Sequence, residues 1–158
     1  LTIEPYHVIY FYYLHAITLI YVGEFHRALK FINKTLNEFK FEDRPQVYLR
    51  IEVLNLITHY ELKNESLVIA LSKQILKKNL TQTILTPIEE KIIQVLYKIT
   101  NTKRMTLKEE NALLKTILDE ILLAKNTSAL SVSILNENYE KWLVAKTKRK
   151  QVSDIYKV

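Results

Sequence analysis

A single glycine, Gly23, constrains the fold of this 158-residue chain more than any other residue. It stands between two segments whose apolar residues recur at three- and four-residue spacing, which is the period of one helix face. Before the glycine this face carries Tyr12, Ala16, Leu19 and Val22, and after it Phe25, Ala28, Leu29, Ile32 and Leu36. A glycine at this point supplies the positive φ that ends one helix and lets the chain reverse. The stretch 12–36 is therefore predicted to form an antiparallel pair of helices.

Composition extends the prediction of helices to the whole chain. One glycine and three prolines leave few turn signals, which argues against an all-β fold. The chain is long enough for one domain with a core of its own. We expect an all-α domain over residues 1–147 and a basic polar tail over 148–158. The seven predicted helices cover about residues 5–22, 25–39, 45–62, 65–78, 87–99, 107–125 and 129–147.

Two capping boxes mark helix starts. Each places a threonine three residues before a glutamate, in Thr86-Pro87-Ile88-Glu89 and Thr106-Leu107-Lys108-Glu109. In this motif the threonine hydroxyl and the glutamate carboxylate each bind a backbone N–H that the first helical turn leaves without a partner. Proline suits the first helical position, where no N–H is needed. Helices are therefore predicted to begin directly after Thr86 and Thr106.

The order of residues around Gly23 resembles the tetratricopeptide repeat (TPR). An aromatic residue is followed by a small residue, a bulky apolar residue and then Gly-x-aromatic-x-x-Ala, as in Tyr12, Ala16, Leu19, Gly23, Phe25 and Ala28. His15, Thr35 and Lys40 depart from the pattern, so the repeat is degenerate. A second, weaker copy spans 53–76 and aligns Lys63 with Gly23, at a period of 40 residues. With the lysine-rich later segments, the chain resembles the C-terminal part of long bacterial TPR-like proteins to which no activity is assigned.

This resemblance implies a right-handed superhelical stack of helical hairpins and a concave wall that binds a protein or peptide partner. In the first copy the wall maps onto Tyr10, Tyr13, Ile17, Ile20 and Tyr21. In the second copy it maps onto Arg50, Val53, Ile57, Tyr60 and Glu61. Two other uses of the tyrosine-rich first helix stay open: packing against a preceding repeat, since a chain that begins at Leu1 is expected to be a fragment, and self-association.

The sequence offers little support for catalysis. With one glycine there is no P-loop and no GxGxxG motif, and the zero cysteines remove thiolate chemistry. Glu52, Asn55 and His59 share one predicted helix face, either for acid–base work or, as we prefer, for hydrogen bonds that close a helix interface. We expect a non-catalytic protein that needs no cofactor or metal. The absence of cysteine also fits a reducing compartment, so the cytoplasm is the expected location.

Charge provides an alternative function. Residues 141–158 hold six of the basic residues and only Asp154 as an acid, in a chain of net charge +6. Such a basic helix and tail could contact phosphates in a nucleic acid, although a solvated chain end is the interpretation that we prefer. The alternative is therefore a regulator that touches nucleic acid through its C-terminus. The apolar stretch 8–22 is too short for a membrane span and contains a histidine, so we expect a buried helix and no membrane contact.

Overall fold

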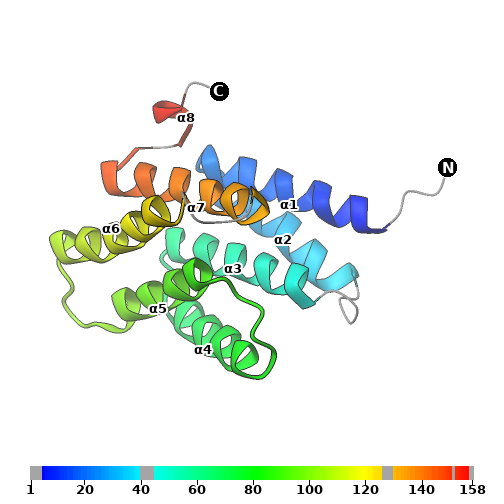
Figure 1. Ribbon diagram of the computed structural model, residues 1–158, viewed down its shortest axis with the longest axis horizontal. Coiled ribbons are helices and arrows are strands. Elements are labelled where there is room, and N and C mark those ends of the chain that lie inside the picture. The colour runs from blue at the N-terminus through cyan, green and yellow to red at the C-terminus, as the bar shows by residue number, and fades with distance from the viewer. Residues whose placement is uncertain (1–4, 40–44, 126–129, 151, 157–158) are drawn as a thin grey trace. The chain divides into compact units, whose positions relative to one another are not determined.

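The computed structural model describes residues 5–39, 45–125, 130–150 and 152–156. Within them the chain is helical and has no strand, which confirms the predicted all-α class (Figure 1). The helices are α1 (Pro5–Tyr21), α2 (Phe25–Glu38), α3 (Pro45–Glu61), α4 (Glu65–Gln82), α5 (Pro87–Asn101), α6 (Leu107–Ala124), α7 (Leu130–Lys148) and the short α8 (Val152–Ile155).

The contacts group the chain into two compact units, residues 1–85 and residues 86–158, where the sequence led us to expect a single domain over 1–147. The first unit contains α1–α4 and the second contains α5–α8. We describe each unit by itself. The superhelical stack implied by the TPR resemblance remains a prediction.

In the first unit α3 is the central helix. It packs against α4 and α2 and also touches α1. Ten of its residues are buried, and they lie on all sides of the helix rather than on one stripe. A helix enclosed in this way needs apolar side chains all round, which explains why its sequence shows no clear amphipathic pattern. Its few polar groups are therefore buried, where a missing hydrogen bond is costly.

The turns α1–α2 and α3–α4 have the same backbone geometry, 40 residues apart. Gly23 has φ 75° and Lys63 has φ 60°, both in the left-handed region. In each turn the N–H of the next residue bonds to the carbonyl five residues back, from Glu24 to Leu19 and from Asn64 to His59. These are Schellman turns. The alignment of Lys63 with Gly23 as equivalent turn positions therefore agrees with the structure.

Substituting Gly23 tests this geometry. A side chain at φ 75° brings Cβ close to the neighbouring carbonyl, so Gly23→Ala is expected to lower the free energy of unfolding by about 1 kcal/mol. Urea denaturation followed by circular dichroism measures the change. Lys63 already carries that strain, so Lys63→Gly is expected to change stability by no more than about 0.5 kcal/mol, because relief of strain is offset by a more flexible unfolded chain. Equal losses in both variants would contradict this account of the turns.

In the second unit α6 packs against both α5 and α7. Both predicted capping boxes are present, so α5 and α6 begin where the sequence indicates. The core is built from branched apolar residues of α5 and α6 together with Tyr139, Trp142 and Leu143 of α7. The carboxylate of Glu89 is also in this core, with 1% of the residue exposed. Its Oε2 accepts from the Thr86 N–H at 2.8 Å, and its Oε1 accepts from the Tyr139 hydroxyl at 3.1 Å.

The structure corrects two predicted boundaries. Helix α4 continues to Gln82 instead of ending near Lys78, because the Asn79 side chain acts inside its last turn. The Asn79 Oδ1 accepts from the N–H groups of both Ile84 and Leu85 at 2.9 Å, and Thr83 has a left-handed backbone. The second correction concerns the C-terminal stretch, where α8 forms and Val152 is buried, so it is more than a polar tail. Of the connection predicted at 41–45, only Pro45 lies within the described residues, as the first residue of α3, and the break predicted at 126–128 lies outside them.

Candidate functional site

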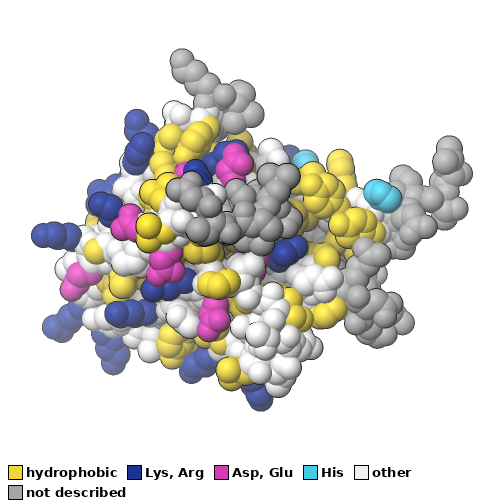
Figure 2. Space-filling model, viewed as in Figure 1, with side chains coloured by type: hydrophobic (Ala, Val, Ile, Leu, Met, Phe, Trp, Pro, Cys, Tyr) yellow, Lys and Arg dark blue, Asp and Glu magenta, His cyan; other side chains and the backbone are white. Residues whose placement is uncertain are grey.

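Helix α1 presents an aromatic face without charge. None of its 17 residues is Lys, Arg, Asp or Glu. Along its N-terminal two thirds the exposed large apolar side chains are Tyr6 (41%), Tyr10 (52%), Phe11 (62%) and Leu14 (43%), which we call the α1 aromatic face; His7 is exposed beside them. Figure 2 shows hydrophobic side chains gathered along this helix. Exposed apolar surface of this kind, contiguous rather than scattered, is typical of interaction sites.

The opposite side of α1 fixes this face in place. Ala16 and Ala28 are almost fully buried, and such small side chains let α1 and α2 approach closely. The ring of His15 lies 6.1 Å from that of Phe11, stacked, and 4.3 Å from that of Phe31, edge-on. His15 stands where the TPR pattern prefers leucine, and here it links the exposed Phe11 to a half-buried ring on α2. Phe11 of the α1 aromatic face is therefore connected to α2 through a chain of ring contacts.

The six residues predicted to bind a partner do not form one exposed wall. Tyr10 is exposed, while Tyr13, Tyr21 and Arg50 are half-buried. Ile17 and Tyr60 are buried, with 5% and 4% exposed, so they contribute to packing and offer almost nothing for a partner to touch. The structure places Tyr10 beside Phe11 and Leu14 instead. The signal that could have indicated these two is helical spacing in a helix with no charge, since Phe11 follows His7 by four residues and Leu14 follows Tyr10 by four.

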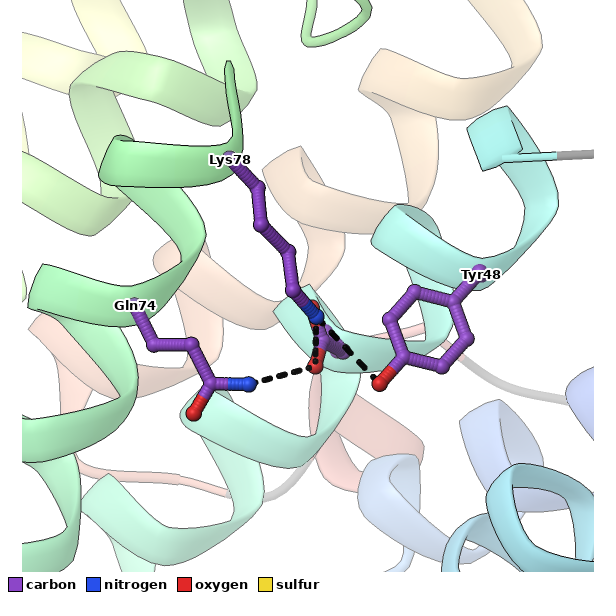
Figure 3. A network of polar contacts seen from close by, with 4 residues as sticks. Tyr48, Gln74 and Lys78 are labelled. Carbon is purple, nitrogen blue, oxygen red and sulfur yellow. Dashed lines mark hydrogen bonds and ion pairs between the residues drawn. The ribbon is translucent and has the colours of Figure 1, made fainter. Parts of the chain in front are cut away.

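A buried carboxylate joins α3 to α4. Glu52 is 3% exposed, and its two carboxylate oxygens accept from the Lys78 ammonium at 3.1 and 3.2 Å. The Gln74 side-chain amide also donates to it, at 3.4 Å. The Lys78 Nζ in turn donates to the Tyr48 hydroxyl at 3.3 Å and lies 4.4 Å from the centre of that ring (Figure 3). Three side chains from both helices thus converge on one carboxylate.

The electrostatics of this cluster hold Lys78 charged. Burial by itself disfavours the ammonium form, but the hydrogen bonds and charge of Glu52 and the contact with Tyr48 outweigh it, so the pKa of Lys78 is raised. Burial and the neighbouring Glu52 also raise the pKa of the Tyr48 hydroxyl, which therefore stays protonated at neutral pH. The carboxylate's oxygens are occupied by donors. This arrangement suits a structural ion pair that closes a helix interface.

Glu52, Asn55 and His59 share a helix face but do not act together. Asn55 is 8% exposed, and its Oδ1 accepts no hydrogen bond from the described part of the chain. His59 instead bonds through its Nδ1 to the Asn64 side-chain amide, 3.0 Å away, at the turn between α3 and α4. This contact requires a neutral imidazole, since Nδ1 must accept. The preferred interpretation of the stripe, hydrogen bonds within a helix interface, agrees with the contacts of Glu52 and His59.

The half-buried position of His59 predicts a pH dependence. Burial lowers its pKa below 6.5, so the folded protein takes up a proton less readily than the unfolded chain. The stabilisation is complete above pH 6.5 and is lost as the pH falls through 6.5 toward the folded-state value. We expect the urea midpoint to decrease between about pH 7.5 and 5.5, and to decrease less in His59→Asn, which cannot ionise. The same decrease in both proteins would contradict a role for His59.

Comparisons of the chain with models of protein families, with curated proteins and with solved structures find no match. The resemblance to TPR proteins therefore remains a prediction from the sequence. No helix among the described residues is both long and apolar enough to cross a membrane. The same part of the chain contains no group of three acidic, histidine or cysteine side chains arranged to hold a metal ion.

Proposed function

We propose that this chain is a non-catalytic, TPR-like interaction module that binds a protein partner along the α1 aromatic face. The observation that carries the proposal is the exposure of Phe11 (62%) and Tyr10 (52%) on a helix without a single charged residue. A partner that matches this surface presents an uncharged apolar segment, such as one face of an amphipathic helix. The absence of cysteine supports action in the cytoplasm.

Two properties favour binding by this face. Aromatic side chains supply a large contact area, roughly 150–250 Å² each when fully covered, and lose little conformational entropy on binding. The stacking of Phe11 against His15 restricts the side chain before a partner arrives, which reduces the entropic cost of ordering it. Because the face has no charge, the affinity should depend weakly on salt.

The test is capture followed by reconstitution. The tagged protein is used to capture partners from lysate of its native host, with and without nuclease and at low and high salt. A captured protein is then purified, and its dissociation constant is measured with wild type and with Phe11→Ala. Loss of a central aromatic anchor commonly costs more than 1–2 kcal/mol, so we expect binding to weaken by more than about tenfold.

Leu80→Ala is the matched control. Leu80 is a large apolar side chain of the same unit, 84% exposed on α4 and away from the α1 aromatic face. Its removal should change the affinity by less than about twofold. We avoid substitutions of Tyr13, whose hydroxyl oxygen is buried, because they would disturb the packing as well. Unchanged binding in the double variant Tyr10→Ala/Phe11→Ala, or capture that disappears with nuclease, would refute the proposal.

A further inference from the structure

Two short segments of the second unit carry the whole net charge of the chain. Residues 98–110 contain Lys98, Lys103, Arg104 and Lys108, and residues 146–150 contain Lys146, Lys148, Arg149 and Lys150. Against these eight basic residues stand only Glu109 and Glu110, which leaves +6, the formal net charge of the entire chain. The charges of the remaining residues sum to zero. The positive charge is therefore concentrated rather than spread.

The fold places the two segments at one end of the second unit. The loop between α5 and α6 leads into the first turn of α6, and α7 packs against α6. Because α6 and α7 run in opposite directions, the C-terminal end of α7 lies beside the start of α6 (Figure 1). In Figure 2, Lys and Arg side chains crowd the corresponding end, at the left of the view. We call these two segments together the basic end.

The backbone of the basic end is fixed at both segments. Arg149 has φ 54°, and the N–H of Lys150 bonds to the carbonyl of Ala145 at 2.9 Å, which makes a Schellman turn like those after α1 and α3. Arg104 is also left-handed, with φ 63°, just before the capping box of Thr106. The last basic residues of α7 are thus presented by an ordered turn, not by a solvated tail.

The side chains of the basic end also differ from three other lysines of the unit in their partners. Lys91, Lys125 and Lys141 each form an ion pair with a glutamate at 3.0 Å or less. In the described part of the chain, by contrast, no ion pair is formed by the seven exposed basic residues of the basic end, which are Lys98, Lys103, Arg104, Lys108, Lys148, Arg149 and Lys150. Unneutralised cations at such density create a positive potential that attracts a polyanion.

We propose that the basic end is a binding site for the phosphate backbone of a nucleic acid, and that it binds without sequence preference. Neighbouring helices lie about 8–10 Å apart, so three helix ends span roughly 20 Å, over which a duplex presents about a dozen phosphates. Arg104 and Arg149 offer planar guanidinium groups that bind phosphate oxygens in pairs. The basic end has no aromatic side chains on which the unpaired bases of a single strand could stack, so a duplex backbone suits it better. Leu107 is its one exposed large apolar residue, which is too little to anchor it in a lipid surface.

The experiment measures fluorescence anisotropy of a labelled mixed-sequence DNA duplex of about 20 base pairs at about 50–200 mM salt. The loop variant Lys103→Gln/Arg104→Gln removes one lysine and one arginine. The control Arg27→Gln/Lys30→Gln removes the same pair of residue types from exposed positions of α2 in the first unit. The loop variant should lose two phosphate contacts, so the slope of log affinity against log salt should fall by about 1.8 and affinity near 100 mM should fall more than tenfold. The control should bind like wild type.

Each alternative outcome overturns the proposal. Equal loss in the control variant would show that net charge alone attracts the DNA. Loss in Lys148→Gln/Lys150→Gln but none in the loop variant would show that only the C-terminal segment binds. Absence of DNA binding, together with binding to vesicles that contain anionic lipid, would assign the basic end to a membrane surface. A change of more than tenfold in affinity between unrelated duplex sequences would contradict backbone recognition. Circular dichroism of each variant verifies that it is folded.

Discussion

Replacing Lys78 by methionine is expected to destabilise the protein by about 2–3 kcal/mol. The substitution keeps the length and apolar stem of the side chain but removes the ammonium that donates to both oxygens of Glu52. A carboxylate that is 3% exposed is then left with uncharged neighbours alone, the amide of Gln74 and the hydroxyl of Tyr48. Removing one partner of a buried pair commonly costs about 3–5 kcal/mol, and we expect less here because the Lys78 side chain is 35% exposed.

Two further variants identify the cause of that loss. Lys77→Met makes the same change at the neighbouring exposed position of α4 and should alter stability by less than about 0.5 kcal/mol. The double variant Glu52→Leu/Lys78→Met removes the orphaned carboxylate, and we expect it to recover most of the stability. Urea denaturation of wild type, the single variants Glu52→Leu and Lys78→Met, and the double variant gives the coupling energy. A double variant that is as unstable as the sum of its single substitutions would contradict the account of a paired buried charge.

Replacing Glu89 by alanine is expected to cost about 3 kcal/mol, whereas the same change at Glu109 should cost about 0.5–1 kcal/mol. Both glutamates complete a capping box on a threonine, so the local motif is the same. Glu89, however, is buried and also accepts the hydrogen bond of the Tyr139 hydroxyl. Its loss removes a cap and leaves a buried hydroxyl without that acceptor, which adds about 1–3 kcal/mol. Glu109 is exposed, and water replaces it.

The measurement is again urea denaturation, at neutral pH, with Tyr139→Phe as the diagnostic variant. In wild type, Tyr139→Phe removes the donor and should be destabilising. In the Glu89→Ala background it removes a hydroxyl that has already lost the Glu89 acceptor, so its cost should be smaller by at least about 1 kcal/mol. If the two Glu→Ala substitutions lower the free energy of unfolding equally, the bond between α5 and α7 contributes nothing measurable to stability. The same conclusion follows if Tyr139→Phe is equally destabilising in both backgrounds.

The sequence predicted those features that depend on a few adjacent residues. The turn at Gly23 and the starts of α5 and α6 follow from local backbone chemistry, and all are present. The predicted end of α4 was wrong because asparagine is typical of loops. Here the Asn79 side chain instead accepts hydrogen bonds from two backbone N–H groups that follow the helix, which the sequence does not reveal. The sequence alone does not distinguish Glu89 from Glu109, since burial is decided by packing against a helix about 50 residues later.

The candidate surfaces likewise differ in how far the sequence predicted them. Tyr10 was predicted as a contact residue and is exposed, but Ile17 and Tyr60 are buried, because the TPR pattern gives a helix face and not its neighbours. The C-terminal cluster of lysines is visible in the sequence. The sequence does not show that this cluster lies near Lys103 and Arg104. The two groups meet only because α6 leads away from the α5–α6 loop and α7 runs back toward it. Surfaces assembled from separate helices cannot be derived from periodicity alone.

The position of Thr86 also indicates where the chain can be divided. It is the first residue of the second unit and also the N-cap of α5, and the groups that complete its cap lie within the next three residues. A polypeptide cleaved or fused at this point would therefore still carry everything needed to begin α5. During synthesis the helix can start without waiting for any distant residue. At the level of the gene, the same position is a favourable junction for recombination, because a segment that begins at Thr86 brings its own helix start with it.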